Sequence, residues 1–177
     1  MRTRLLAPAV LAVAVAGCSG LGSNADPRSV DGGLTGPTHF REVCVSARFS
    51  DEYTLGVATA ENSSSDELTL LDAELTDADG IELVGTDVVR PGNLMDSFGV
   101  WNGYPPMQLA SAPDNERLWR LRTPIADDLV EPGERINFIL HLRGEGTSGP
   151  IEVTYETADG EEAIWASNVR YRIRWRC

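Results

Sequence analysis

The sequence predicts an all-β domain built as a sandwich of two antiparallel sheets, and three observations predict it. From Thr38 onward, apolar and polar residues alternate with the period of two that is typical of half-buried strands. No stretch keeps a helical period through three turns. Clusters of Gly, Asp and Pro separate the alternating segments, as turns separate strands. About eight such segments fit one sandwich, which we expect to be immunoglobulin-like, and a closed barrel is the alternative.

The first half of the domain predicts strands joined by short turns. The expected core side chains of the first strand are Val43, Val45, Ala47 and Phe49. Residues 53–57 continue the pattern after a turn, and the polar run 61–67 interrupts it. The segments 68–76 and 81–89 then flank Asp77-Ala78-Asp79-Gly80, which predicts a hairpin with Gly80 at positive φ.

The second half begins with an irregular segment, residues 91–113, which predicts a long loop. The turn Glu131-Pro132-Gly133-Glu134 leads into a predicted half-buried strand with core residues Ile136, Phe138, Leu140 and Leu142. A further strand covers 151–155. In the last segment the expected core residues are Val169, Tyr171, Ile173 and Trp175, and the opposite face carries Arg170, Arg172, Arg174 and Arg176.

The N-terminus has the order of an export signal. Arg2 and Arg4 precede an uncharged apolar run, residues 5–17, which is shorter than the ~20 residues that a membrane-spanning helix needs. The run ends in Val15-Ala16-Gly17-Cys18, which resembles the lipobox of bacterial lipoproteins. The resemblance implies cleavage before Cys18 and attachment of a diacylglyceryl group to its thiol. Two acyl chains hold a protein stably on a membrane.

The stretch after Cys18 is rich in Gly, Ser, Asp and Pro and has almost no large apolar side chain, which is typical of a flexible tether. We therefore expect a signal peptide over 1–17, a lipidated tether over 18–38 and a β-sandwich domain over 39–177. The expected location is the extracytoplasmic face of the cell membrane, with the lipid anchor as the membrane contact.

The chain has two further cysteines, Cys44 and Cys177. The export signal predicts an oxidising compartment, where a pair of cysteines favours a disulfide. A metal pair or redox site would favour closer spacing. The bond would join the first and last strands if these are neighbours, as in many immunoglobulin-like sandwiches. Cys44 is out of phase with Val43 and Val45, which predicts a bulge or a strand buried on both faces.

Composition excludes some functions. The chain has 27 Asp plus Glu against 15 cationic residues, all of them Arg, and a formal net charge of -12. Such acidity argues against sequence-independent nucleic-acid binding, which depends on basic patches that neutralise phosphates. No pattern in the chain indicates a cofactor.

Two segments are candidate binding surfaces. Trp101, Tyr104 and Pro105 bring rigid aromatic and proline surface into the irregular segment, although Trp101 and Tyr104 could instead fold back and cap the core. The arginines at 170, 172, 174 and 176 form a positive stripe suited to a wall polymer or an envelope protein. Alternatively, Asp and Glu side chains on a neighbouring strand form cross-strand ion pairs with these arginines.

Signals for catalysis and metal binding are weak. His141 alternates with apolar residues and is expected to face outward, and no local motif marks an activated serine near it or His39. The two His with Met95 and Met107 lack the organised spacing of a copper carrier. Asp77 and Asp79 resemble the start of a calcium loop, but its twelfth position is Val88 rather than Glu. We therefore expect no enzyme and no metal; a copper carrier and an envelope hydrolase are the alternatives.

The whole chain resembles small actinobacterial lipoproteins in its lipobox, its tether, the motif WNGYPP, the EPGE-led strand and the cysteine at residue 177. The resemblance implies a surface location and a β-sandwich, and it carries over no catalytic residue. The sequence thus predicts a membrane-anchored, non-enzymatic binding or accessory module of the cell envelope.

Overall fold

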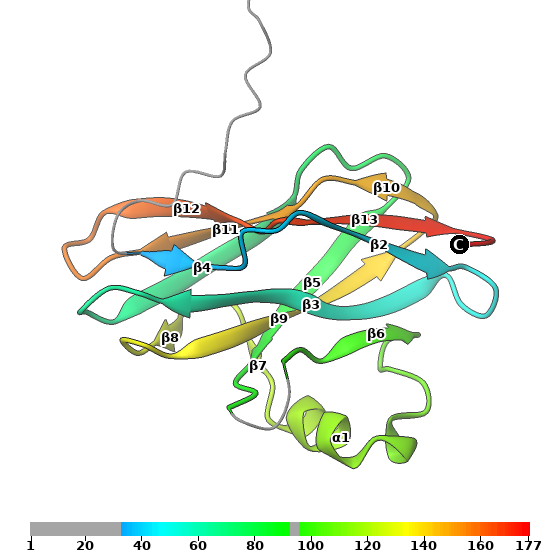
Figure 1. Cartoon of the computed structure of the whole chain (residues 1–177), viewed down its shortest axis with the longest axis horizontal. Helices are drawn as coiled ribbons and strands as arrows, with labels where there is room; N and C mark the ends of the chain where they lie inside the picture. Colours follow the sequence, from blue (N-terminus) through cyan, green and yellow to red (C-terminus); the bar gives the residue numbers. More distant parts are fainter. Residues whose placement is uncertain (1–32, 93–95) are drawn as a thin grey trace, which may run out of the picture.

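The computed structural model describes residues 33–92 and 96–177, which form a β-sandwich with one short α-helix (Figure 1). One layer is a six-stranded sheet, and the other layer consists of a three-stranded and a four-stranded sheet. These sheets confirm the all-β sandwich that the alternating pattern predicts.

The six-stranded sheet has the order β1-β3-β9-β5-β7, and β6 pairs with the part of the β3 edge that β1 leaves open. All its pairs are antiparallel. Its strands are β1 (Leu34–Thr35), β3 (Glu52–Asn62), β5 (Glu82–Val89), β6 (Gly99–Asn102), β7 (Thr123–Pro124) and β9 (Arg135–Arg143).

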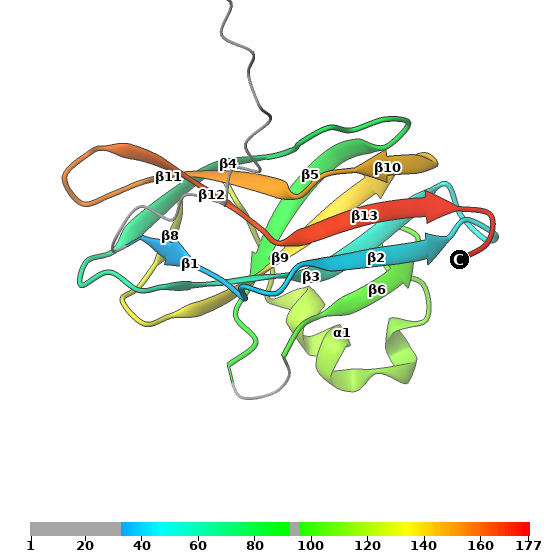
Figure 2. The ribbon, with the colours of Figure 1, turned by 45° about the horizontal axis from the view of Figure 1, so that its top comes forward.

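The second layer is made of the sheets β10-β13-β2 and β12-β11-β4-β8. Their strands are β2 (Arg41–Ser46), β4 (Leu68–Leu75), β8 (Asp128–Val130), β10 (Gly146–Ser148), β11 (Ile151–Glu156), β12 (Glu162–Ala166) and β13 (Val169–Arg174). The pair β13 and β2 is parallel, whereas the sequence predicts antiparallel sheets (Figure 2). The first and last long strands of the domain are therefore neighbours.

The main core lies between the two layers. It contains the alternate side chains that the pattern assigns to the core, among them Tyr53, Leu55, Phe138, Leu140 and Tyr171, which are all fully or almost fully buried. The predicted core positions Phe49 and Trp175 are wrong, because β2 ends at Ser46 and β13 ends at Arg174, so both rings lie beyond the paired strands and are exposed.

A smaller second core covers the other face of the six-stranded sheet. Its buried side chains are Val89, Phe98, Leu109, Leu118 and Ile139, with Trp101 and Trp119 packed against them. The covering segments are the 3-10 helix η1 (Leu109–Ser111) and the α-helix α1 (Pro113–Arg120). Strand β9 is consequently buried on both faces, and its predicted half-buried character is wrong.

The irregular segment 91–113 is more ordered than a long loop. It contributes β6 and η1, and α1 begins at its end. Pro113 at the first turn, Asp114 and Glu116 near the N-terminus and Arg120 in the last turn suit a helix. Two turns are too short for the periodic signal that identifies longer helices.

The predicted hairpin at 77–80 is wrong in its pairing. Strand β4 pairs with β11 and β8, whereas β5 pairs with β9 and β7, so the turn carries the chain from one layer to the other. Gly80 has the predicted positive φ, 76°. A Cβ there would lie 2.3 Å from the carbonyl oxygen of Glu145, so this glycine also permits the close approach of the segment before β10.

The folded part begins before the predicted boundary at residue 39. Leu34 and Thr35, which the sequence analysis assigns to the tether, pair with Asn62 and Glu61 of β3. The Leu34 side chain is fully buried in the main core. The signal peptide, Cys18 and residues 19–32 of the tether lie outside the described residues.

Candidate functional site

Trp101 lies on β6 and faces the second core. Its indole Nε1 donates a hydrogen bond to the carbonyl oxygen of Phe98 at 3.0 Å, and the two rings lie 6.0 Å apart. Asn137 of β9 holds the backbone at Phe98 in place. Its side-chain oxygen accepts a hydrogen bond from the Phe98 amide, and its Nδ2 donates to the Ala58 carbonyl. Trp101 therefore has one packed face and one face at the surface.

Tyr104 is held entirely by internal contacts. Its ring stacks on His141, with centroids 3.8 Å apart, and meets the edge of Trp119 at 5.3 Å. Its hydroxyl donates to Oδ2 of Asp87 at 3.0 Å. Burial raises the pKa of Tyr104, and the nearby Asp87 carboxylate raises this pKa further. These contacts are those of the capping alternative, whereas Pro105, the next residue, is exposed.

His141 faces away from the main core, as its position in β9 predicts, but Tyr104 covers it. Its side chain is 13% exposed, and Nε2 lies 3.4 Å from Oε1 of Glu52. This nitrogen has no hydrogen-bond partner among the described residues. The expectation of an open surface position is thus wrong, since the sequence does not reveal the covering layer. His39 is exposed.

Three further residues complete this polar cluster, Asp87, Arg122 and Trp119, and no sequence pattern marks them as site residues. Arg122 donates from Nε to Asp87 at 2.9 Å and from Nη1 to the Trp119 carbonyl at 2.7 Å. Its guanidinium lies 3.8 Å from the centre of the Trp119 ring. Because no local motif links residues 35 positions apart, only the fold brings Asp87 and Arg122 together. The cluster ties α1 and the segment before it to β5 and β9.

An open apolar groove lies beside β6. Phe49, Val100 and Met107 are exposed by 73%, 40% and 49%. With Trp101, Asn102 and Gln108 they line a hollow of about 440 Å³, and none of these six side chains is charged. Gly103, at positive φ, and the hydrogen bond from the Met107 amide to the Asn102 carbonyl set Met107 beside the strand.

Strand β6 lies beside this groove, and the carbonyl of its residue Asn102 accepts the hydrogen bond from the Met107 amide. Among the described strands β6 pairs only with β3. One edge of β6 therefore lacks a strand partner, and the backbone groups on such an edge can accept an added strand. The groove thus combines apolar side chains with a strand that has one strand partner among the described residues.

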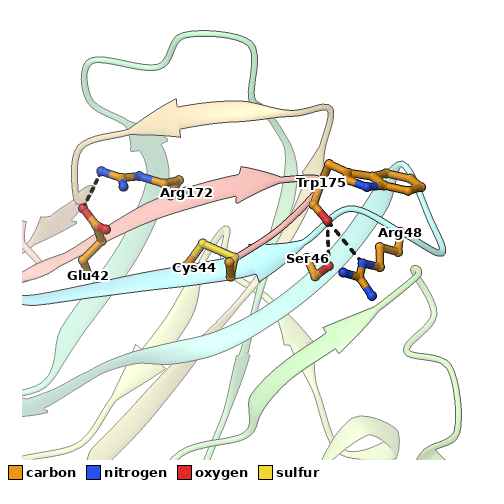
Figure 3. The surroundings of a disulfide bond; sticks show 7 residues. Glu42, Cys44, Ser46, Arg48, Arg172 and Trp175 are labelled. Carbon is orange, nitrogen blue, oxygen red and sulfur yellow. Dashed lines mark hydrogen bonds and ion pairs between the residues drawn. A yellow bond between two sulfur atoms is a disulfide. The ribbon is translucent and has the colours of Figure 1, made fainter.

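The arginines of β13 lie on the outer face of the three-stranded sheet. Arg170, Arg172 and Arg174 alternate with the buried Val169, Tyr171 and Ile173, as predicted. Glu42 forms an ion pair with only one of them, Arg172, at 3.0 Å (Figure 3). Arg170 instead lies over the ring of Phe40, and Arg176 follows beyond the end of the strand.

Cys44 and Cys177 are joined by the predicted disulfide, with Cα atoms 5.7 Å apart. Neither a bulge nor a doubly buried strand is needed, because the ladder of β2 and β13 is continuous and Cys44 faces the outer surface opposite Arg172. After Arg174 the chain turns back, and the Trp175 carbonyl accepts hydrogen bonds from Ser46 Oγ and Arg48 Nε (Figure 3).

Within residues 33–92 and 96–177, no group of three or more His, Cys, Asp or Glu side chains is arranged to hold a metal ion. In the same part of the chain, no helix is both long and apolar enough to cross a membrane. No protein-family model, curated protein or solved structure matches the chain.

Proposed function

We propose that the chain is a lipid-anchored, extracytoplasmic binding module of the cell envelope, and that the groove beside β6 binds an extended apolar segment of a partner protein. The export signal and the lipobox-like cysteine support the location. The observation that carries the binding role is the groove itself, where Phe49, Val100 and Met107 expose apolar surface beside β6, whose second edge has no strand partner among the described residues.

The lining of the groove favours an uncharged ligand. About a quarter of the chain is charged, 24%, yet the six side chains that line the hollow carry no charge. An apolar side chain that enters such a site loses its contact with water, which contributes about 1.5–3 kcal/mol when burial is complete. A charged side chain would lose hydration without gaining a partner.

The second edge of β6, which has no strand partner among the described residues, favours an extended ligand. A peptide that adds a strand to a sheet edge gains main-chain hydrogen bonds, and its alternate side chains enter the adjoining hollow. The packed cluster around Tyr104 and His141 supports this surface, because it fixes the segment that carries Trp101 and Met107. An immunoglobulin-like arrangement of the sandwich would place this groove on a rigid scaffold, as recognition loops require.

Peptide selection tests the binding role. The purified chain is used to select from a phage-displayed library of random peptides, and the selected peptides are then measured against two double variants. In Val100→Asp with Met107→Asp the groove is charged, and we expect at least about a tenfold loss of affinity. In Leu129→Asp with Ile164→Asp, two exposed apolar residues outside the groove receive the same charges, and we expect no loss. Equal losses of peptide affinity in the two double variants would refute the groove as the binding site.

The anchor is tested separately by intact-mass spectrometry of the protein from cell membranes. The expected mass is that of a chain beginning at Cys18 with a diacylglyceryl group, and Cys18→Ala should release the protein from the membrane fraction. An unmodified, uncleaved N-terminus would contradict the anchor but leave the peptide-binding result standing.

A further inference from the structure

Positive charge is concentrated on one face of this acidic chain. Of its 15 arginines, five lie on or beside the outer face of the sheet β10-β13-β2: Arg48, Arg170, Arg172, Arg174 and Arg176. Glu42 forms an ion pair on this face, with Arg172. Glu42 and Asp77 also line one hollow together with Arg170 and Arg172, so two carboxylates lie beside the first two arginines of the row. Arg174 and Arg176 have no ion-pair partner among the described residues.

The spacing of these charges is regular. Arg170, Arg172 and Arg174 lie at alternate positions of one strand, so their Cα atoms repeat at about 7 Å. Strand β13 has neighbours on both sides, and the disulfide holds the segment after Arg174 against β2. The backbone that carries this row of arginines is therefore fixed, and each guanidinium group can bind two oxygens of one phosphate.

We propose that this face binds a linear polyanion whose phosphodiester groups repeat at a similar distance, with the polymer lying along β13. An extended polymer with a three-carbon unit between successive phosphodiesters has such a repeat. Arg170, Arg172 and Arg174 contact three successive phosphates, and Arg48 and Arg176 extend the positive field at the end of the strand.

The charge of the neighbouring sheet favours a linear polymer over a membrane surface. The sheet β12-β11-β4-β8 belongs to the same layer (Figure 2), and its strands carry the acidic side chains of Asp72, Glu74, Glu152, Glu156 and Glu162. Glu152 is paired with Glu74, and Glu156 with Glu162. A flat anionic bilayer that reached the arginines would approach these carboxylates too, whereas a single polymer chain contacts β13 alone.

A binding titration tests the proposal on the full chain, purified in detergent as cells produce it. The probe is fluorescently labelled poly(glycerol phosphate), measured at several salt concentrations. We expect Arg170→Gln, Arg172→Gln and Arg174→Gln together to weaken binding by about tenfold or more at low salt. The slope of log affinity against log salt should fall by about 2, because each phosphate contact of a single strand contributes about 0.7.

The matched control removes three exposed arginines elsewhere, through Arg117→Gln, Arg120→Gln and Arg143→Gln, and should change affinity less than about twofold. Melting curves of both triple variants verify folding. Arg170→Lys, Arg172→Lys and Arg174→Lys together should keep the salt dependence but bind more weakly than the natural chain, because an ammonium group cannot hold two phosphate oxygens as a planar guanidinium does. Absence of polymer binding, or equal losses in the two Gln variants, would overturn the proposal. Displacement of the polymer by phosphatidylglycerol mixed micelles at equal phosphate concentration would also overturn it, in favour of a lipid surface.

Discussion

The ring of Tyr104 lies flat against the imidazole of His141, with the two planes 6° apart and the centroids 3.8 Å apart. Through this contact the segment after β6 is fastened to the central strand β9. The Tyr104 hydroxyl extends the link to Asp87 of β5. The groove therefore depends on a packed polar cluster that is separate from its own lining.

The first prediction concerns this cluster. Tyr104→Ala should lower the free energy of unfolding by about 2–3 kcal/mol, because it removes a half-buried ring from between His141 and Trp119. Tyr104→Phe keeps the ring and should cost about 1 kcal/mol. Urea unfolding measures both changes. A change below about 0.5 kcal/mol in Tyr104→Ala would show that the ring is not needed for packing.

A second prediction tests the close approach of Phe98 to β3. A Cβ at Gly56 would lie 2.5 Å from Cβ of Phe98 and 2.6 Å from Cδ1 of Ile139. Gly56→Ala should therefore destabilise the domain by about 1–3 kcal/mol through overpacking. Gly85→Ala is the matched control on β5, since nothing lies within 4 Å of the added carbon. If the two variants melted alike, the second core would not be packed as described.

The third prediction concerns the disulfide, whose cysteines are 133 positions apart. Replacing Cys44 and Cys177 together by Ser should lower the free energy of unfolding by about 2–5 kcal/mol. The main cause is the larger conformational freedom of the unfolded chain. Dithiothreitol should lower the melting temperature of the natural chain and leave the double variant unchanged. An equal response of both proteins to the reductant would contradict the bond.

The fourth prediction concerns alkaline pH. Burial raises the pKa of Tyr171 strongly, more than the nearby Ser167 hydroxyl and Arg41 lower it. Burial also raises the pKa of Tyr53, Tyr104 and Tyr155. These pKa values are higher in the folded state than in the unfolded chain, where tyrosine has a pKa of about 10. The contribution of these tyrosines to the free energy of unfolding is therefore fully present below about pH 10 and is lost as pH rises above it.

Each such tyrosine can contribute a slope of up to about 1.4 kcal/mol per pH unit. Tyr171→Phe should therefore lose stability less steeply above pH 10 than the natural chain, and should differ from it by no more than about 1 kcal/mol at pH 7. Urea unfolding across this pH range measures the two slopes. Identical slopes would mean that Tyr171 ionises as readily in the folded state as in the unfolded state.

Strand positions could be predicted from the sequence, but strand partners could not. Alternation identifies Ile136 to Leu142 and Val169 to Ile173 because one face of each segment enters the main core. The same pattern suggests a hairpin at 77–80, since it contains no information about which layer each strand joins. Burial of Asn137 and Ile139 on the second face of β9 depends on a covering segment that has no periodic signal of its own.

The candidate site was predictable only in part. Trp101 is recognisable in the sequence because aromatic and proline residues replace alternation around it, and the spacing of the arginines predicts their row on one face of the last strand. The place of Phe49 and Met107 in the groove could not be inferred, because they come from separate turns and meet only beside β6. Asp87 and Arg122 likewise belong to no sequence motif, and only the fold brings them close to Tyr104.

Photo-crosslinking in living cells tests the proposed binding of a peptide in the groove most directly. A photoreactive phenylalanine analogue replaces Met107 in one strain and Ile164, an exposed residue outside the groove, in another. The account predicts a discrete adduct from position 107, mapped to an extended apolar segment of one envelope protein and abolished by Val100→Asp, with no such adduct from position 164. Absence of any adduct at 107, or the same adducts from both positions, would contradict it.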